Sequence, residues 1–289
     1  MTKIALGTAQ FGNEYGVANS SGEVKTKQIK EILNFSSNHN INFIDTAMDY
    51  ESSEKKLGNS NLDNFKIISK LPKLKSEIVN LEKWVRRKIE QSLENLKLNK
   101  IHGLLFHNPQ DLLGSEGEKI YKILLKLKDE GLISKIGISI YSPKILEDLI
   151  PIYSFDIVQA PFNIIDNRII NSGWADKLNN MEIKIHVRSI FLQGLLLMPK
   201  EKIPFKFKKW ISLFEDLESW SKRHKIDKKE ICLSFVKKFS FFEKIIVGID
   251  NLKQLEEISS LSTKPILKKF PDLYCDDELL IDPSKWNKL

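Results

Sequence analysis

The 289-residue sequence has little of what marks secreted, membrane-spanning or modular proteins. It has 2 cysteines, Cys232 and Cys275, which are too few for a disulfide framework and lack metal-site spacing. No apolar run approaches the ~20 residues that a bilayer-spanning helix needs. The opening MTKIALGTAQFG has one lysine and a very short apolar run, unlike a secretory signal. No stretch rich in Pro, Gly or Ser separates two domains. We therefore expect a cytoplasmic protein of one domain, without a membrane partner or a metal.

The charge of +7 comes from 45 basic and 38 acidic residues, and most lysines alternate with glutamates and serines, as on solvated helix faces. One segment is more basic, PKEKIPFKFKKW from Pro199 to Trp210. Basic residues interleaved with aromatic ones can bind single-stranded nucleic acid, or they can contact a phosphorylated ligand. A solvated loop that leads into a helix is the simplest interpretation. We expect no nucleic-acid partner.

Eight short β-rich runs alternate with stretches of helical period. The runs cover residues 3–7, 41–45, 66–70, 102–107, 134–140, 155–160, 183–189 and 243–248. Apolar residues recur at helical spacing over residues 81–96, 210–220 and 252–261. Strands that alternate with helices imply parallel pairing and right-handed crossovers. The pattern predicts a single-domain (β/α)8 TIM barrel over residues 1–289. An open doubly wound sheet is the alternative, but no G-x-G-x-x-G follows the first run.

The barrel interpretation predicts where catalytic groups lie, because such groups gather at the C-terminal ends of barrel strands and in the loops that follow. The second strand ends in Asp45, and Tyr50 lies in the loop after it. The third strand ends in Lys70 and the fourth in His107. These four side chains come from three consecutive strands, and we expect them to meet at one mouth of the barrel.

Together these four residue types form a proton-transfer device. A phenol with a pKa of ~10 is a poor acid at neutral pH, but a nearby ammonium favours the phenolate and lowers that pKa. A carboxylate beside the lysine keeps the lysine charged and in position. A neighbouring histidine can donate a hydrogen bond to an oxygen on which negative charge develops. The combination suits a carbonyl or alcohol oxygen.

Each residue also has a simpler structural interpretation when it is taken alone. Asp45 could cap a helix, Tyr50 could be an ordinary loop aromatic, and Lys70 could be a surface charge. His102 shares a strand with His107 but lies at its N-terminal end, where barrel residues serve stability. We therefore expect His102, and likewise His186, to be structural.

A series of motifs runs along almost the whole chain in a fixed order. They are GTAQFG, FIDTA-x-x-Y with E-x-x-x-G from Glu54 to Gly58, SKLP, LLFHNP, GISIYSP, VQAPFNIIDNR, RSIFLQGLL and VGIDNLKQLEE. In this order the sequence resembles an aldo-keto reductase. The resemblance implies an NAD(P)-dependent oxidoreductase that reduces an aldehyde or ketone to an alcohol. It assigns Tyr50 as general acid, Lys70 and Asp45 as the residues that tune it, and His107 as the residue that orients the carbonyl.

The same resemblance implies a cofactor site. Its expected residues are Ser139 and Gln159, which match positions that hold the carboxamide, and Arg188, Ser189, Gly194, Gly248, Lys253, Gln254 and Glu257. NADP(H) is expected ahead of NAD(H). The turn after the eighth strand departs from the family, because Gln254 stands at the usual arginine position and Asp250 would repel a 2′-phosphate. We therefore expect only a small preference for NADPH.

Three further departures concern the mouth of the barrel. Ile140 stands where an asparagine usually helps to hold the carboxamide. This change removes one hydrogen bond to the carboxamide, unless Asn163 or water replaces it. Arg188 stands where an aromatic ring often stacks under the nicotinamide, and Glu51 stands where a glycine often follows the tyrosine. Arg188 and the lysine-rich segment favour an anionic or sugar-like carbonyl compound as the substrate.

Two other functions stay open at this point. The chain could be a catalytically slow dinucleotide-binding sensor or subunit on the same fold, or another barrel enzyme such as a lyase. The loops that set the substrate are expected at residues 11–25, 108–117, 195–207 and 271–289. The sequence makes no prediction of the oligomeric state.

Overall fold

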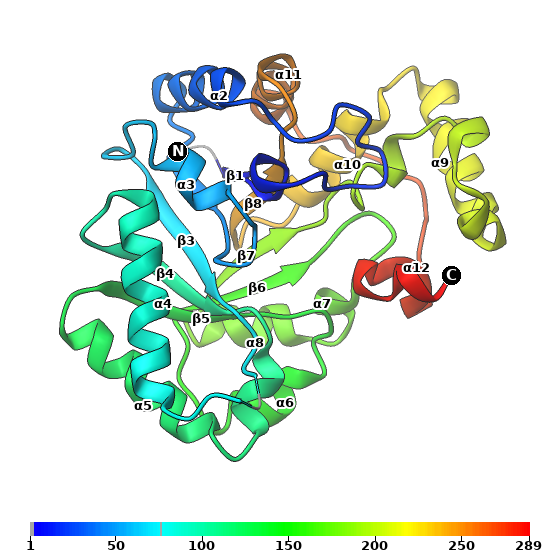
Figure 1. The fold of residues 1–289 in the computed structure, drawn as a ribbon. Helices are drawn as coiled ribbons and strands as arrows, with labels where there is room; N and C mark the ends of the chain where they lie inside the picture. Colours follow the sequence, from blue (N-terminus) through cyan, green and yellow to red (C-terminus); the bar gives the residue numbers. More distant parts are fainter. Residues whose placement is uncertain (1–2, 76) are drawn as a thin grey trace.

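The computed structural model describes residues 3–75 and 77–289, which form a closed barrel of eight parallel strands surrounded by helices (Figure 1). The strands are β1 Ile4–Gly7, β2 Phe43–Asp45, β3 Lys66–Leu71, β4 Ile101–Phe106, β5 Ile133–Ser139, β6 Ile157–Pro161, β7 Lys184–Arg188 and β8 Phe242–Gly248. They follow chain order around the barrel, and β8 pairs with β1. This closure confirms the (β/α)8 prediction, and the open-sheet alternative is wrong.

Helices cover the outside of the barrel (Figure 1). The α-helices are α1 Ala9–Gly12, α2 Thr26–Asn38, α3 Ser53–Leu57, α4 Leu81–Leu96, α5 Gly117–Asp129, α6 Ile145–Leu149, α7 Arg168–Asn171, α8 Trp174–Asn180, α9 Ile211–His224, α10 Lys228–Lys237, α11 Leu252–Thr263 and α12 Glu278–Ile281. The 3-10 helices are η1 Pro109–Leu113, η2 Leu195–Leu197, η3 Lys200–Lys202, η4 Phe205–Trp210 and η5 Pro283–Lys288. The three predicted helices are α4, α9 and α11. Within the described residues, no helix combines the length and apolarity that crossing a membrane requires.

The inside of the barrel has an apolar layer below a polar one. The apolar layer consists of Ala5, Phe43, Ile68, Leu105, Ile157 and Ile246. Side chains two residues apart on a strand point to the same face. Asp45, Lys70 and Gln159 each follow one of these apolar residues by two positions, and all three are buried. The period of the strands therefore places these polar groups inside the barrel, at its C-terminal end.

The C-terminal segment packs against the same end of the barrel. Leu273, Cys275 and Trp286 belong to an apolar cluster with residues of η4, α9 and the loops that follow β6 and β7. The backbone N–H of Cys275 donates to the carbonyl oxygen of Ile165 at 2.8 Å. In Figure 1 this red segment lies beside the barrel and ends near α12. The tail of the chain therefore packs on the loops that follow β6 and β7.

Candidate active site

A buried ion pair lies at the C-terminal end of the barrel. The ammonium of Lys70 donates to Oδ2 of Asp45 at 2.7 Å and to the carbonyl oxygen of Thr46 at 2.8 Å. The two charged side chains are 1% and 7% exposed. Burial lowers the pKa of Lys70, and the charge of Asp45 opposes that shift. Because removing an ion from water costs several kcal/mol, the charged state of this lysine depends on its carboxylate partner.

A second pair of buried side chains fixes the other oxygen of Asp45. The amide Nε2 of Gln159 donates to Asp45 Oδ1 at 2.6 Å, and the hydroxyl of Ser139 donates to Gln159 Oε1 at 3.1 Å. Both residues were expected to hold a carboxamide. The structure places them next to Asp45, so they form one hydrogen-bonded chain with its carboxylate.

The loop that carries Tyr50 is fixed by close backbone packing. A Cβ atom on Gly12 would lie 1.9 Å from the carbonyl oxygen of Tyr50, so only glycine permits this approach. The same carbonyl accepts a hydrogen bond from the backbone N–H of Ser53 at 2.9 Å. Glu51 has φ of 42°, in the left-handed region that favours glycine. The structure therefore explains why a glycine suits position 51, and Glu51 adopts this conformation with some strain.

The E-x-x-x-G part of the signature anchors this loop from the outside. Buried Glu54 accepts hydrogen bonds from Ser69 on β3 and Ser92 on α4, both at 2.7 Å. Burial raises the pKa of Glu54, and the two serine hydroxyls oppose the shift. A Cβ atom on Gly58 would lie 2.0 Å from the carbonyl oxygen of Asn95. The carboxylate and the glycine together bring α3 against β3 and α4.

The structure brings the four predicted catalytic residues together. The ammonium of Lys70 lies 5.1 Å from the centre of the Tyr50 ring. The rings of Tyr50 and His107 meet edge to face, with centroids 5.9 Å apart. His107 Nδ1 lies 3.8 Å from Oδ2 of Asp49, which sequence reasoning did not single out. The phenol thus has an imidazole on one side and the buried ion pair on another.

The pKa of Tyr50 shifts in the direction opposite to the one expected from the sequence. Burial raises it, the negative charge of Asp45 raises it further, and the charge of Arg188 opposes both. The expectation of a lowered pKa is therefore wrong for this structure. The physical reason is that the charge of Lys70 is paired with Asp45, so desolvation dominates. At neutral pH the phenol keeps its proton, which is the state that a proton donor needs.

A cavity of about 350 Å³ opens beside Tyr50. Its lining includes Asp45, Tyr50, Arg188, Ser189, Gly194, Gly248, Gln254 and Glu257 from the predicted site. The other predicted site residues do not line the cavity. Lys70 and Gln159 are bonded to Asp45, and Ser139 is bonded to Gln159. His107 lies beside Tyr50, and Lys253 is exposed on α11. The volume falls within the ~300–1,000 Å³ of small-molecule sites. The cavity extends from the predicted catalytic residues to the start of α11.

The loop after β7 has an unusual backbone where it lines this cavity. Ser189, Leu192, Gln193 and Gly194 have φ of 60°, 48°, 55° and 85°, all in the left-handed region. Asn163 donates to the carbonyl oxygen of Ser189 at 3.1 Å and accepts from the backbone N–H groups of Ile165 and Asp166. The side chain of Asn163 therefore joins the loops that follow β6 and β7.

The far end of the cavity combines a helix N-terminus with an unpaired acceptor. Asn251 caps α11 by accepting from the backbone N–H of Gln254 at 3.0 Å. Gln254 is bonded twice to Asp250, through the Asp250 backbone N–H at 2.9 Å and Asp250 Oδ2 at 3.1 Å. Asp250 Oδ1 is buried and has no hydrogen-bond partner within the described residues. A dinucleotide fits here, because the helix N-terminus favours an anion and the orphan oxygen could accept from a ribose hydroxyl.

Sequence reasoning missed two phenols at the mouth. Tyr15 lines the cavity and accepts a hydrogen bond from Gln193 Nε2 at 3.2 Å. Tyr141 lies under the guanidinium of Arg188, 4.5 Å from ring centre to Cζ. The mouth therefore holds two further phenols besides Tyr50. Tyr15 lies in a loop without periodic pattern, whereas Tyr141 stands inside the quoted GISIYSP motif and could have been noted there.

The two histidines predicted to be structural lie among packed side chains. His186 is 1% exposed and pairs through Nε2 with Glu243 at 2.8 Å. The ring of His102 meets the edge of Phe43, and burial lowers its pKa to about 4. Both lie in the strands away from the cavity. Within residues 3–75 and 77–289, no group of three His, Cys, Asp or Glu side chains could hold a metal.

The lysine-rich segment from Pro199 to Trp210 forms η3 and η4 and leads into α9. Lys200 pairs with Glu215, Lys209 pairs with Asp277, and Lys206 donates to the carbonyl oxygen of Trp286. These contacts are those of a loop that packs on α9 and on the tail. The absence of a nucleic-acid partner stays a prediction.

The buried ion pair predicts a specific pattern of stability changes. Asp45→Asn leaves an uncompensated ammonium and should lower the free energy of unfolding by about 3–5 kcal/mol. Lys70→Met should also destabilise, because it leaves the carboxylate alone. The double variant removes both charges and should be more stable than Asp45→Asn. Urea unfolding of the four proteins measures this cycle, and additive losses in the double variant would contradict the pairing.

Comparisons with known proteins identify the family. The model of the aldo/keto reductase family matches residues 3–270. An aldo-keto reductase of Bacillus halodurans, solved in its holo form, superposes with a TM-score of 0.74 at 16% identity, over 92% of this chain and 88% of that one. A candidate aldo-keto reductase of Pseudomonas aeruginosa gives a TM-score of 0.65 at 21% identity, over 90% and 89%. No curated protein matches by sequence. The match over nearly the whole chain shows that this protein belongs to the aldo/keto reductase family, a family of oxidoreductases.

Proposed function

We propose that the protein reduces a small aldehyde or ketone to an alcohol with NADPH or NADH as the hydride donor. The observation that supports this most is the meeting of Tyr50, His107 and the buried Lys70–Asp45 pair at one end of a cavity. The proposal includes action in the cytoplasm, without a nucleic-acid or membrane partner.

The residues at the mouth divide the work of proton transfer. When bound, the nicotinamide supplies the hydride that adds to the carbonyl carbon. Tyr50 donates its proton to the carbonyl oxygen, and His107 donates a hydrogen bond that orients this oxygen. Lys70 then stabilises the phenolate that Tyr50 becomes, and Asp45 keeps Lys70 charged and in position. Tyr50, kept protonated by burial, starts in the state that reduction requires.

The first test removes the proton donor. Tyr50→Phe deletes one hydroxyl, and the backbone of the loop stays fixed by Gly12 and Ser53. Proton transfer by a positioned side chain contributes roughly 10²–10⁴-fold, so we expect kcat to fall by about this factor while the Kd of the cofactor stays the same. Cofactor oxidation with a reactive test aldehyde measures the first quantity and fluorescence titration the second. A variant that keeps more than about a tenth of the parent kcat would show that Tyr50 is not the acid.

The same assay separates the alternative function. A parent protein that binds the cofactor but does not turn over the aldehyde would favour a sensor or subunit.

The second test concerns the phosphate of NADPH. Gln254 stands at the position where the family resemblance leads us to expect an arginine. Its side chain is hydrogen-bonded to Asp250, whose carboxylate has one oxygen without a partner among the described residues. Lys229, the lysine that lines this end, is already paired with Glu257 at 2.5 Å. We expect NADPH to bind with a margin over NADH below about 100-fold, or ~2.8 kcal/mol.

Asp250→Asn should increase that margin, because it removes the charge that repels a phosphate and keeps the shape of the side chain. The measurement is the Kd of both cofactors at low and moderate salt, for the parent and the variant. Lys253→Met removes the charge of the exposed lysine on α11 and tests separately whether this predicted cofactor residue contributes to the ratio. An unchanged ratio in Asp250→Asn would mean that this carboxylate does not face the adenosine ribose.

A further inference from the structure

Arg188 ends β7 and lines the same cavity as Tyr50. Its Nη2 donates to the carbonyl oxygen of Ile140 at 3.0 Å and its Nη1 to the hydroxyl of Ser189 at 3.3 Å. The guanidinium lies over the Tyr141 ring, 4.5 Å from its centre. These three contacts hold a partly buried cation in a fixed orientation on the cavity wall.

No carboxylate of the described residues pairs with the cation of Arg188. Within residues 3–75 and 77–289 its contacts are a carbonyl oxygen, a hydroxyl and a ring, with no carboxylate. A guanidinium has five N–H donors, and these contacts leave several of them unused. Partly buried charges are usually paired, because desolvation is costly. These contacts therefore leave donors of the Arg188 guanidinium free for an anionic group.

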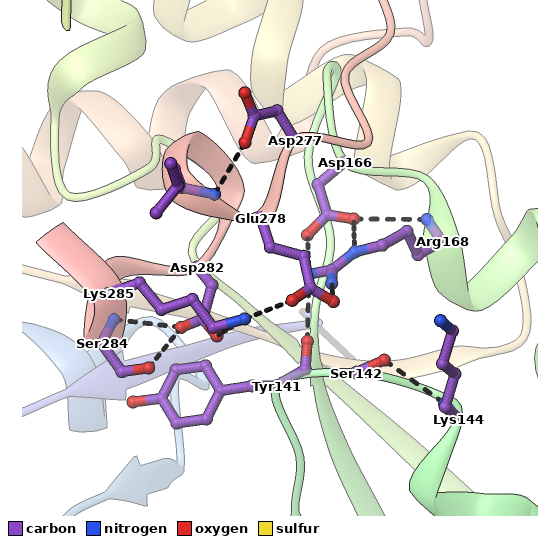
Figure 2. A network of polar contacts seen from close by, with 11 residues as sticks. Tyr141, Ser142, Lys144, Asp166, Arg168, Asp277, Glu278, Asp282, Ser284 and Lys285 are labelled. Atoms are coloured by element: carbon purple, nitrogen blue, oxygen red, sulfur yellow. Dashed lines mark hydrogen bonds and ion pairs between the residues drawn. The ribbon is translucent and has the colours of Figure 1, made fainter. Parts of the chain in front are cut away.

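Arg168 shows by contrast how this chain treats a structural arginine. Its guanidinium pairs with buried Asp166 at 2.9 Å and lies 3.8 Å from Glu278 of the C-terminal segment. Arg168 Nη2 also donates to the carbonyl oxygen of Tyr141 at 3.0 Å. Figure 2 shows this network, in which Arg168 lies between Asp166, Glu278 and the backbone of Tyr141. The residue whose ring supports Arg188 is thus fixed from behind by a fully paired arginine.

We propose that Arg188 binds an anionic group of the substrate, so that the preferred substrates are carbonyl compounds that carry a carboxylate or a phosphate. This inference rests on the proposed reductase function and adds the substrate class. A planar guanidinium with free donors matches the two oxygens of a carboxylate or phosphate. Its position beside Tyr50 places the anion and the reacting carbonyl in one cavity.

The test compares two aldehydes that differ in one charge, 4-carboxybenzaldehyde and its methyl ester, and adds glyceraldehyde 3-phosphate against glyceraldehyde. Hydrogen bonds to charged groups are stronger than neutral ones, so we expect kcat/KM of the parent to favour the anion by about tenfold or more. Arg188→Met should remove this preference, and Arg188→Lys should keep part of it. Arg87→Met, the same change at an exposed arginine of α4, should leave the ratio as in the parent. Equal ratios in the parent and Arg188→Met overturn the proposal.

The same anion could instead be a phosphate of the cofactor, and a second measurement separates the two sources. If Arg188 binds substrate, Arg188→Met leaves the Kd of NADPH and of NADH within about threefold of the parent, a change below ~0.7 kcal/mol. If both Kd values weaken by tenfold or more and the aldehyde ratio stays unchanged, Arg188 binds the cofactor and the proposal is wrong. Thermal unfolding checks that each variant is folded. If Arg188→Met does not fold, Arg188→Lys serves in its place, because it keeps the charge and changes the donor geometry.

A binding measurement keeps the inference separate from turnover. Calorimetry follows 4-(hydroxymethyl)benzoate, the product acid, as it binds to Tyr50→Phe in the presence of NADPH. We expect binding in Tyr50→Phe and at least tenfold weaker binding in the double variant with Arg188→Met. Equal binding in both overturns the role of Arg188 even if Tyr50 is the acid. Arg188-dependent binding together with full turnover by Tyr50→Phe would instead overturn the proposed function of Tyr50 alone.

Discussion

The buried ion pair between Lys70 and Asp45 is the interaction on which the rest of the active site depends. Lys70 lies on the interior face of β3, two residues after Ile68, where an unpaired ammonium would be strongly disfavoured. Asp45 stabilises it with one oxygen and accepts from Gln159 with the other. The pair therefore fixes the end of β2, and with it the start of the loop that carries Tyr50.

The pair also links two parts of the site that have different tasks. Ser139 and Gln159, which match carboxamide positions, form a continuous hydrogen-bonded chain with Asp45 and Lys70. A ligand that takes a hydrogen bond from Gln159 changes the partners of the carboxylate that compensates Lys70. Tyr50 is held separately by Gly12 and by the Glu54 anchor. The predicted carboxamide residues and the ion pair thus share one buried network, while the loop of Tyr50 has a separate anchor.

The sequence predicts the barrel and the four catalytic residues because both follow from the period of the strands. Asp45, Lys70 and His107 end consecutive strands, and parallel strands of a barrel end at one mouth. Tyr15 and Tyr141 reach the same mouth from loops, and no periodic pattern predicts where a loop folds. The sign of the Tyr50 pKa shift depends on burial and on the pairing of Lys70, which only the three-dimensional structure shows. The unpaired state of Asp250 Oδ1 and the network around Arg168 likewise arise from contacts distant in sequence.

The most direct test of the role given to the ion pair is the pH dependence of kcat for Lys70→Met beside the parent, at saturating cofactor. Removing the ammonium leaves the charge of Asp45 uncompensated near Tyr50, and a negative charge disfavours the phenolate that remains after proton donation. We expect kcat of Lys70→Met to be lower at every pH by about tenfold or more, with the apparent pKa of the catalytic acid raised. A profile for Lys70→Met that overlays the parent would contradict the claim that the pair controls the acid.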